Sequence, residues 1–153
     1  MATLSLNRRI DLIAATAIEQ VRRLPSGQAA VTLRSGEAWT QLPTGGHRPI
    51  VSVKPSVSDA GRLYTADMTA RLPLSLASDD MLRTLRRMHQ VVARYQKTDG
   101  TWQLVGSPTF PLRLAIERID SEEAASFSGY ELRLTGKQTH GQLQIDKSYI
   151  NNG

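Results

Sequence analysis

The stretch from Ser78 to Tyr130 reads SDDMLRTLRRMHQVVARYQKTDGTWQLVGSPTFPLRLAIERIDSEEAASFSGY. It opens with a helix signal, because Ser78 is a good N-cap and two aspartates follow it at the positive end of the helix dipole. At about 100° per residue, a helix over 78–88 places four apolar side chains on one face: Met81, Leu82, Leu85 and Met88. Thr84 and the arginines lie on the opposite face. The pattern therefore predicts a short helix with one buried face and one exposed face.

After His89 the apolar residues recur at every second position, which predicts a strand. Asp99-Gly100 separates this strand from the next alternating run, and this dipeptide is favoured in two-residue type I′ turns. With those two residues as the turn, Tyr95 lies opposite Leu104, and Trp102 shares their face. The other face is then nearly all polar, as in an antiparallel sheet that is solvated on one side.

Two later runs alternate in the same way and predict a second hairpin, with apolar residues Leu112, Leu114 and Ile116 on one strand and Tyr130, Leu132 and Leu134 on the other. Their connection, Asp120–Ser128, is acidic and longer than a tight turn. We expect it to be a mobile tip or a contact with a partner, with Glu122 and Glu123 as the candidate residues.

The rest of the chain also favours strands, separated by Gly- and Pro-rich turns. The expected strands are 10–21 (with a helix as the alternative), 29–33, 38–42, an edge strand at 50–53, and 62–72. We expect 43–49 and 55–61 to be irregular. The fold class predicted is mainly β (α+β), an antiparallel β-sandwich or partly closed barrel with one flanking α-helix. Residues 1–136 form the single domain, and 137–153 are expected to be a polar C-terminal arm.

Composition limits the class of protein. A chain of 153 residues with 40% hydrophobic and 22% charged residues is typical of one folded domain. It has no cysteine, which excludes disulfides, thiolate catalysis and cysteine-bound metals. No apolar run approaches the roughly 18 residues of a membrane span, and the first residues lack the order of a signal peptide. We therefore expect synthesis in a cytoplasm and no membrane contact.

The chain carries no recognisable catalytic motif. The three histidines, His47, His89 and His140, are far apart and have no second ligand at metal-binding spacing. Gly45-Gly46 lacks the Lys and Ser/Thr of a phosphate-binding loop, and there is no Gly-x-Ser-x-Gly nucleophile elbow. The sequence thus predicts no enzyme, no catalytic or metal-binding residues, no cofactor and no small-molecule substrate.

A formal charge of +5 makes nucleic acid a partner to consider. The basic residues are spread along the chain, however, and alternate with apolar ones, which also suits solvated faces. The candidate partner-binding residues form four groups: the helix arginines Arg83, Arg86 and Arg87, the loop residues His47 and Arg48, the acidic pair Glu122 and Glu123, and the terminal Tyr149 and Ile150.

Four segments carry a family resemblance: Ser-Gly-Glu-Ala-Trp-Thr-Gln-Leu-Pro at 35–43, Val-Ala-Arg-Tyr-x-x-x-Asp-Gly-x-x-x-Leu-Val-Gly-Ser-Pro at 92–108, Pro-Leu-Arg-Leu at 111–114, and Ser-Gly-Tyr-Glu-Leu-Arg-Leu-Thr-Gly-Lys-Gln-Thr-His at 128–140. Over residues 10–141 the chain resembles small structural proteins from the tail modules of phages and prophages of the Bacteroides group. The resemblance implies a tail tube, terminator or completion subunit in the virion, made in the host bacterial cytoplasm. The implied partners are further copies of the chain in a homo-oligomeric ring and other tail proteins. The resemblance assigns no functional residue to this sequence.

The main alternative is a small basic β-barrel that binds nucleic acid through Trp, Tyr and Arg on one sheet face. Salt-dependent binding to DNA favours this alternative, whereas oligomers that are insensitive to salt favour the ring.

Overall fold

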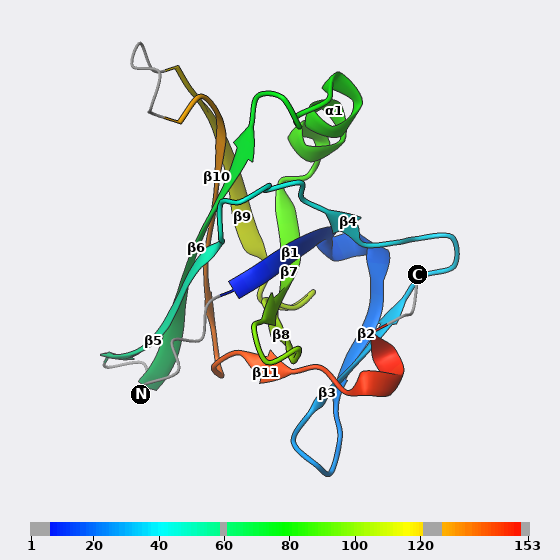
Figure 1. Cartoon of the computed structure of the whole chain (residues 1–153). Helices are drawn as coiled ribbons and strands as arrows, with labels where there is room; N and C mark the ends of the chain where they lie inside the picture. The colour runs from blue at the N-terminus through cyan, green and yellow to red at the C-terminus, as the bar shows by residue number, and fades with distance from the viewer. Residues whose placement is uncertain (1–6, 59–60, 121–126, 151–153) are drawn as a thin grey trace.

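The computed structural model describes residues 7–58, 61–120 and 127–150 (Figure 1). The fold is mainly β with one α-helix, which confirms the predicted class. In chain order the elements are β1 (Asn7–Ala14), the 3-10 turn η1 (Ala15–Ala17), β2 (Ile18–Arg23), β3 (Ala29–Leu33), β4 (Thr40–Gln41), β5 (Ile50–Ser58), β6 (Gly61–Pro73), α1 (Asp79–Arg87), β7 (Gln90–Lys97), β8 (Trp102–Val105), β9 (Leu112–Ile119), β10 (Gly129–Gln138), β11 (Leu143–Gln144) and the 3-10 turn η2 (Lys147–Tyr149).

One large antiparallel sheet runs in the order β11-β8-β7-β9-β10-β6-β5, and β2 and β3 form a separate hairpin. Strand β7 is the turning point of this sheet. Along one edge it pairs with β8 through 93–96 and with β9 through 90–91, and along the other it pairs with β1, which in turn pairs with β4. The sheet therefore changes partners at β7, and its two parts enclose an apolar core between them.

This first core collects inward-facing side chains from both parts of the sheet. Its large members on the strands and on the loop after β4 include Ile10, Leu12, Leu42, Met68, Leu72, Val91, Tyr95, Leu112, Leu132 and Leu134, and α1 adds two leucines. The β9–β10 hairpin is paired as the alternation predicts, with Leu114 opposite Leu134. The first core corresponds to the sandwich interior expected from the sequence.

A second core lies on the other face of β1, β7 and β8, where the β2–β3 hairpin covers them. Its buried members include Ile13, Ile18, Val31, Val92, Trp102, Leu104, Leu143 and Ile145. Strand β7 is consequently buried on both faces, with Val91, Ala93 and Tyr95 in the first core and Val92 in the second. We expected a polar, solvated face on β7 and β8, and this expectation is wrong. The β2–β3 hairpin and the C-terminal segment cover that face.

Helix α1 has the bounds and the orientation that the sequence predicts. The Ser78 hydroxyl accepts a hydrogen bond from the Met81 N–H at 3.2 Å, which caps the first turn. Leu82 and Leu85 are buried in the first core, and Met81 and Met88 are half-buried against it. The three arginines are exposed on the opposite face.

The turn at Asp99-Gly100 differs from the predicted two-residue type. The Gly100 N–H donates to the Lys97 carbonyl, and the Lys97 N–H donates to the Thr101 carbonyl, each at 2.9 Å, so 98–100 form a three-residue loop. Within 98–100, Gly100 alone has a positive φ, at 90°, as in a type I turn that ends in a glycine bulge. The extra residue shifts the register by one, so Tyr95 lies opposite Gln103 and the predicted Tyr95–Leu104 pair is wrong. Such a shift sends every side chain to the other face, which is why Trp102 and Leu104 lie in the second core.

Three further expectations are corrected. The single strand at 10–21 is divided by η1, because β1 joins the large sheet while β2 joins β3. The edge strand at 50–53 continues through Ser58, so 55–58 are not irregular. In the expected arm 137–153, β10 runs to Gln138, and Leu143 and Ile145 are buried in the second core.

Replacing Leu85 with alanine should lower the free energy of unfolding by about 2–5 kcal/mol, because the side chain is fully buried where α1 meets the first core. The matched control is Arg87→Ala on the exposed face of the same helix, which should cost less than about 0.5 kcal/mol. Equilibrium unfolding in urea measures both changes. A similar small loss for both variants would show that the helix does not contribute to the core.

Replacing Gly100 with valine should cost about 1 kcal/mol or more, because a β-branched residue resists the positive φ of this loop position. Gly46→Val is the control, since Gly46 has no positive φ and open space around its α-carbon. Thermal and urea unfolding compare the two. Equal losses at both positions would contradict the role given to the backbone of Gly100.

Candidate functional site: an arginine cleft beside helix α1

The helix arginines line a cleft between α1 and the start of β10. It has a volume of about 440 Å³ and is lined by Asp79, Leu82, Arg83, Arg86, Arg87 and Tyr130. Arg86 also lines an adjoining depression with His89, Leu114 and Ile116, so the basic surface continues along α1 towards the middle of β9. The structure thus brings together the three arginines that the sequence singled out as one group.

The positive charge of this cleft is largely unpaired. Arg83 lies 3.5 Å from Asp80, but both side chains are mostly exposed, and such pairs contribute little. Neither Arg86 nor Arg87 makes a hydrogen bond or an ion pair with any residue in the described part of the chain. The lining of the cleft therefore combines two guanidinium groups that have no ionic partner in the described chain with one carboxylate, that of Asp79.

Tyr130 forms the wall of the cleft and is held from behind by Arg118 on β9. The Arg118 Nη1 donates to the Tyr130 hydroxyl at 3.4 Å, and its Nε donates to Asp120 at 3.0 Å. The hydrogen bond to Asp120 has the larger effect and that to Tyr130 the smaller, and both raise the pKa of Arg118. Arg118 therefore positions Tyr130 and already has an acidic partner.

The loop residues His47 and Arg48 do not line this cleft. Both are exposed, and the His47 ring meets the edge of the Phe127 ring at 4.9 Å between ring centres. Arg71 lies over the same phenylalanine at 5.1 Å. Glu122 and Glu123 lie outside the described residues.

The terminal pair takes a different place from the expected arm. Tyr149 and Ile150 are half-buried and pack against the second core of their own chain. The Asp146 N–H donates to the Ala29 carbonyl at 2.9 Å, and Ile145 forms a parallel bridge with Ala29. The C-terminal segment is therefore part of the fold.

A second cavity, of about 400 Å³, lies between β2 and the loop after β8. Its lining includes Glu19, Arg23, Phe110 and His140. The His140 Nδ1 lies 2.8 Å from the carbonyl of Gly141, and no hydrogen bond joins His140 to Glu19. In the described ranges, no three acidic, histidine or cysteine side chains come together as metal ligands.

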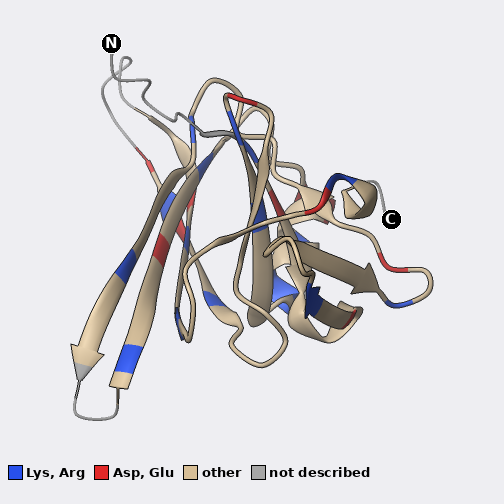
Figure 2. Cartoon of the chain, turned by 90° about the horizontal axis from the view of Figure 1, so that it is seen from below, with Lys and Arg blue, Asp and Glu red and all other residues tan. Residues whose placement is uncertain are grey.

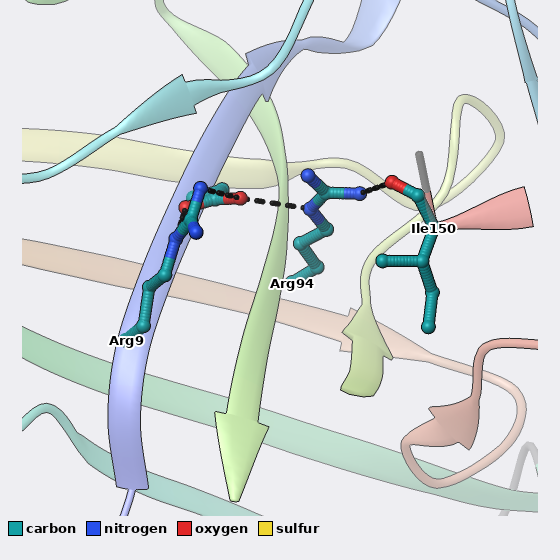
Figure 3. Close-up of polar contacts among 4 residues, drawn as sticks. Arg9, Arg94 and Ile150 are labelled. Atoms are coloured by element: carbon teal, nitrogen blue, oxygen red, sulfur yellow. Dashed lines mark hydrogen bonds and ion pairs between the residues drawn. The ribbon is translucent and has the colours of Figure 1, made fainter. Parts of the chain in front are cut away.

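A buried ionic cluster, which sequence reasoning missed, lies where β1 meets β7 (Figure 3). Asp11 is fully buried and accepts from the Nε of Arg9 and the Nε of Arg94, each at 2.9 Å. The guanidinium of Arg94 lies between two tryptophan rings, 4.6 Å from the centre of Trp39 and 4.7 Å from that of Trp102.

Arg94 also contacts the C-terminal segment, because its Nη1 donates a hydrogen bond to the Ile150 carbonyl at 2.8 Å (Figure 3). Burial lowers the pKa of Arg94, and the neighbouring Asp11 opposes this effect. Because every polar partner comes from the chain itself, the cluster joins β1, β7 and the C-terminal segment. A charged residue within each apolar alternating run was the sequence signal that could have revealed it.

Strand β5 is the third surface of interest. It is a nine-residue edge strand that pairs only with β6 in the described sheet. The β5–β6 hairpin extends away from the rest of the chain (Figure 2), and Ile50 and Val57 on it are 69% and 75% exposed. Pro55 and Lys54 are residues that discourage pairing at such an edge.

Comparison of the chain with family models, with curated proteins and with solved structures gives no match. Among the described residues, no helix is long and apolar enough to cross a membrane.

Replacing Asp11 with asparagine should cost about 3–5 kcal/mol of folding stability, because it leaves the buried guanidinium of Arg94 without its anion. Asp67→Asn is the matched control, since it breaks the exposed Asp67–Arg133 pair and should cost less than about 1 kcal/mol. Urea unfolding measures both.

The double variant Asp11→Leu with Arg94→Met should be more stable than the sum of its single changes. Hydrogen exchange at residues 143–150 should rise in Arg94→Met, because the contact with the Ile150 carbonyl is lost. If Asp11→Asn costs no more than Asp67→Asn, the buried pair does not hold these segments together.

Proposed function

We propose that this chain is a structural subunit of a phage tail or neck that assembles into a ring, as a tail terminator, completion or tube-like subunit. The family resemblance supplies the biological setting. The observation that carries the assembly is the long β5 edge, which among the described strands pairs with β6 alone.

A long open edge strand is a hazard for a soluble protein, because its unpaired N–H and C=O groups can pair with another chain. On β5 this edge is accompanied by two large apolar side chains, Ile50 and Val57, that are mostly exposed. Covering them with a neighbouring subunit buries apolar area, whereas Lys54 and Pro55 in the middle of β5 discourage a continuous backbone ladder with that neighbour. The edge is therefore suited to an interface between copies.

A ring requires that each subunit offer two different surfaces, so that one contact can repeat until it closes. The β5 edge and the arginine cleft are two such surfaces. They lie on different elements, β5 at one end of the strand order and α1 over the first core. This arrangement favours a head-to-tail contact over a symmetric pair.

A nucleic-acid-binding module is the second candidate, and the unpaired Arg86 and Arg87 are the observation that favours it. In that function the chain would be a monomer that binds DNA less tightly as salt is raised. The two functions are thus distinguishable with the purified protein.

We expect the purified chain to form oligomers of defined mass by light scattering, with ring views by negative-stain microscopy. The double variant Ile50→Lys, Val57→Lys should shift the protein to monomers, because it places charge on the exposed edge without touching a core. The control Gln20→Lys, Gln142→Lys adds the same charge at two other exposed positions and should leave the oligomers intact.

A wild-type chain that stays monomeric at all concentrations, together with salt-dependent binding to duplex DNA, would replace this proposal with the nucleic-acid-binding function.

A further inference from the structure

We propose that the cavity beside β2 binds an extended peptide of another protein, which adds as a strand to the side of β2 away from β3. The peptide residues that face the cavity are a basic, an apolar and an acidic one at alternate positions. The residues that line this cavity are all different from those of the arginine cleft, and none belongs to β5. The proposal therefore does not depend on the assembly proposed above.

The first feature is the open side of β2. In the described sheets β2 pairs with β3 alone, whereas β3 has a further neighbour through the bridge between Ala29 and Ile145. Apart from the β2–β3 ladder, no backbone hydrogen bond in the described chain involves 19–23. No residue of β3 lines the cavity, so the cavity lies where a further strand can pair with β2.

The second feature is a β-bulge that places Glu19 at the cavity. The register between β2 and β3 skips Glu19, which is an extra residue in the ladder. Bulges of this kind re-aim a side chain next to binding sites. Beyond the bulge, Val21 and Arg23 share a face of the strand, and both line the cavity with Glu19. Strand β2 thus presents a carboxylate, an apolar side chain and a guanidinium in order along the cavity.

The third feature is the charge of the lining. In the described chain, neither the Glu19 carboxylate nor the Arg23 guanidinium has a hydrogen bond or an ion pair. These opposite charges match a partner with a basic residue near Glu19 and an acidic residue near Arg23. A nucleic acid does not match, because its phosphates would meet the Glu19 carboxylate.

The fourth feature is the opposite wall, which the fold holds in place. Two hydrogen bonds of 3.1 Å close the loop after β8, from the Ser107 N–H to the Phe110 carbonyl and from the Phe110 N–H to the Ser107 hydroxyl. Just before this loop, the Gly106 N–H donates to the buried side chain of Gln138 at 2.8 Å. Phe110 and Leu143 make the wall apolar. The cavity is therefore preformed and can take an apolar side chain.

An extended peptide matches all four features. Glu19 and Arg23 are four residues apart, which is roughly 10–13 Å along a strand. A peptide of five residues spans that distance, whereas the two charges of a free amino acid do not. In a strand added to β2, every second side chain faces the cavity, so the central apolar residue meets the wall that Phe110 forms.

Three pentapeptides with acetylated and amidated ends test the charge pattern: Lys-Thr-Leu-Thr-Glu, Lys-Thr-Leu-Thr-Lys and Glu-Thr-Leu-Thr-Glu. Saturation-transfer difference NMR measures their binding, because it detects weak ligands of proteins of any mass. The wild type should bind the mixed peptide about fivefold more tightly than either of the others, because each of those sets one like charge against the cavity.

Variants of β2 should change this preference. Glu19→Arg should favour the peptide with two glutamates, and Arg23→Glu should favour the peptide with two lysines. The matched control is Arg22→Glu, because Arg22 is an exposed neighbour that does not line the cavity. It changes the net charge as Arg23→Glu does and should keep the wild-type preference. Circular dichroism checks that every variant is folded.

Two N-methylated forms of the mixed peptide test the strand pairing. One form carries methyl groups on both threonine nitrogens, and the other on the leucine and glutamate nitrogens. Alternate N–H groups of a strand point to opposite edges, so one form should lose at least about tenfold more affinity than the other.

The inference is overturned if no peptide binds at about millimolar concentration, if Arg22→Glu changes the preference as Arg23→Glu does, or if both N-methylated forms bind equally. A wild type that prefers the peptide with two glutamates overturns it as well, and would assign the cavity to an acidic partner. None of these results depends on the oligomeric state that tests the ring, so the two proposals can fail separately.

Discussion

The buried ion pair between Asp11 and Arg94 is the interaction on which the rest of the fold depends. Two charges out of water are tolerated only when each has the other as a partner, so the pair permits one register between β1 and β7, with Asp11 directly opposite Arg94. A slip by one residue would place the carboxylate in the first apolar core, among Tyr95 and its neighbours. The two tryptophan rings around Arg94 and its bond to the Ile150 carbonyl extend the same constraint to the second core and to the C-terminal segment.

Because β1 and β7 are buried on both faces, the surfaces left for partners lie away from them. The arginine cleft belongs to α1, whose other face is anchored in the first core by Leu82 and Leu85. The β5 edge belongs to the far end of the large sheet. Within the described residues, the interior is thus covered on both sides of β7, while the arginine cleft and the β5 edge lie at the periphery.

The elements with strong local signals were predictable. Ser78 caps α1 as expected, and the alternation of β9 and β10 gives the observed pairing, because caps and periodicity act within a few residues. The Asp99-Gly100 turn was placed correctly but its type was not, since the same dipeptide serves both a two-residue turn and a three-residue loop with a glycine bulge. The choice between them depends on which face of β8 is covered, and that is decided by β2, β3 and the C-terminal segment.

The amino-acid sequence by itself determined the mainly β class, the helix with its exposed arginines, and the clustering of Arg83, Arg86 and Arg87 on one face, because these depend on spacing along one element. Only the tertiary structure decided that Asp11 and Arg94 meet, that Leu143 and Ile145 complete a core, and that the arginines border a cleft with Tyr130. Those contacts join residues far apart in the chain, and their stability comes from desolvation and pairing across elements, which no local pattern records.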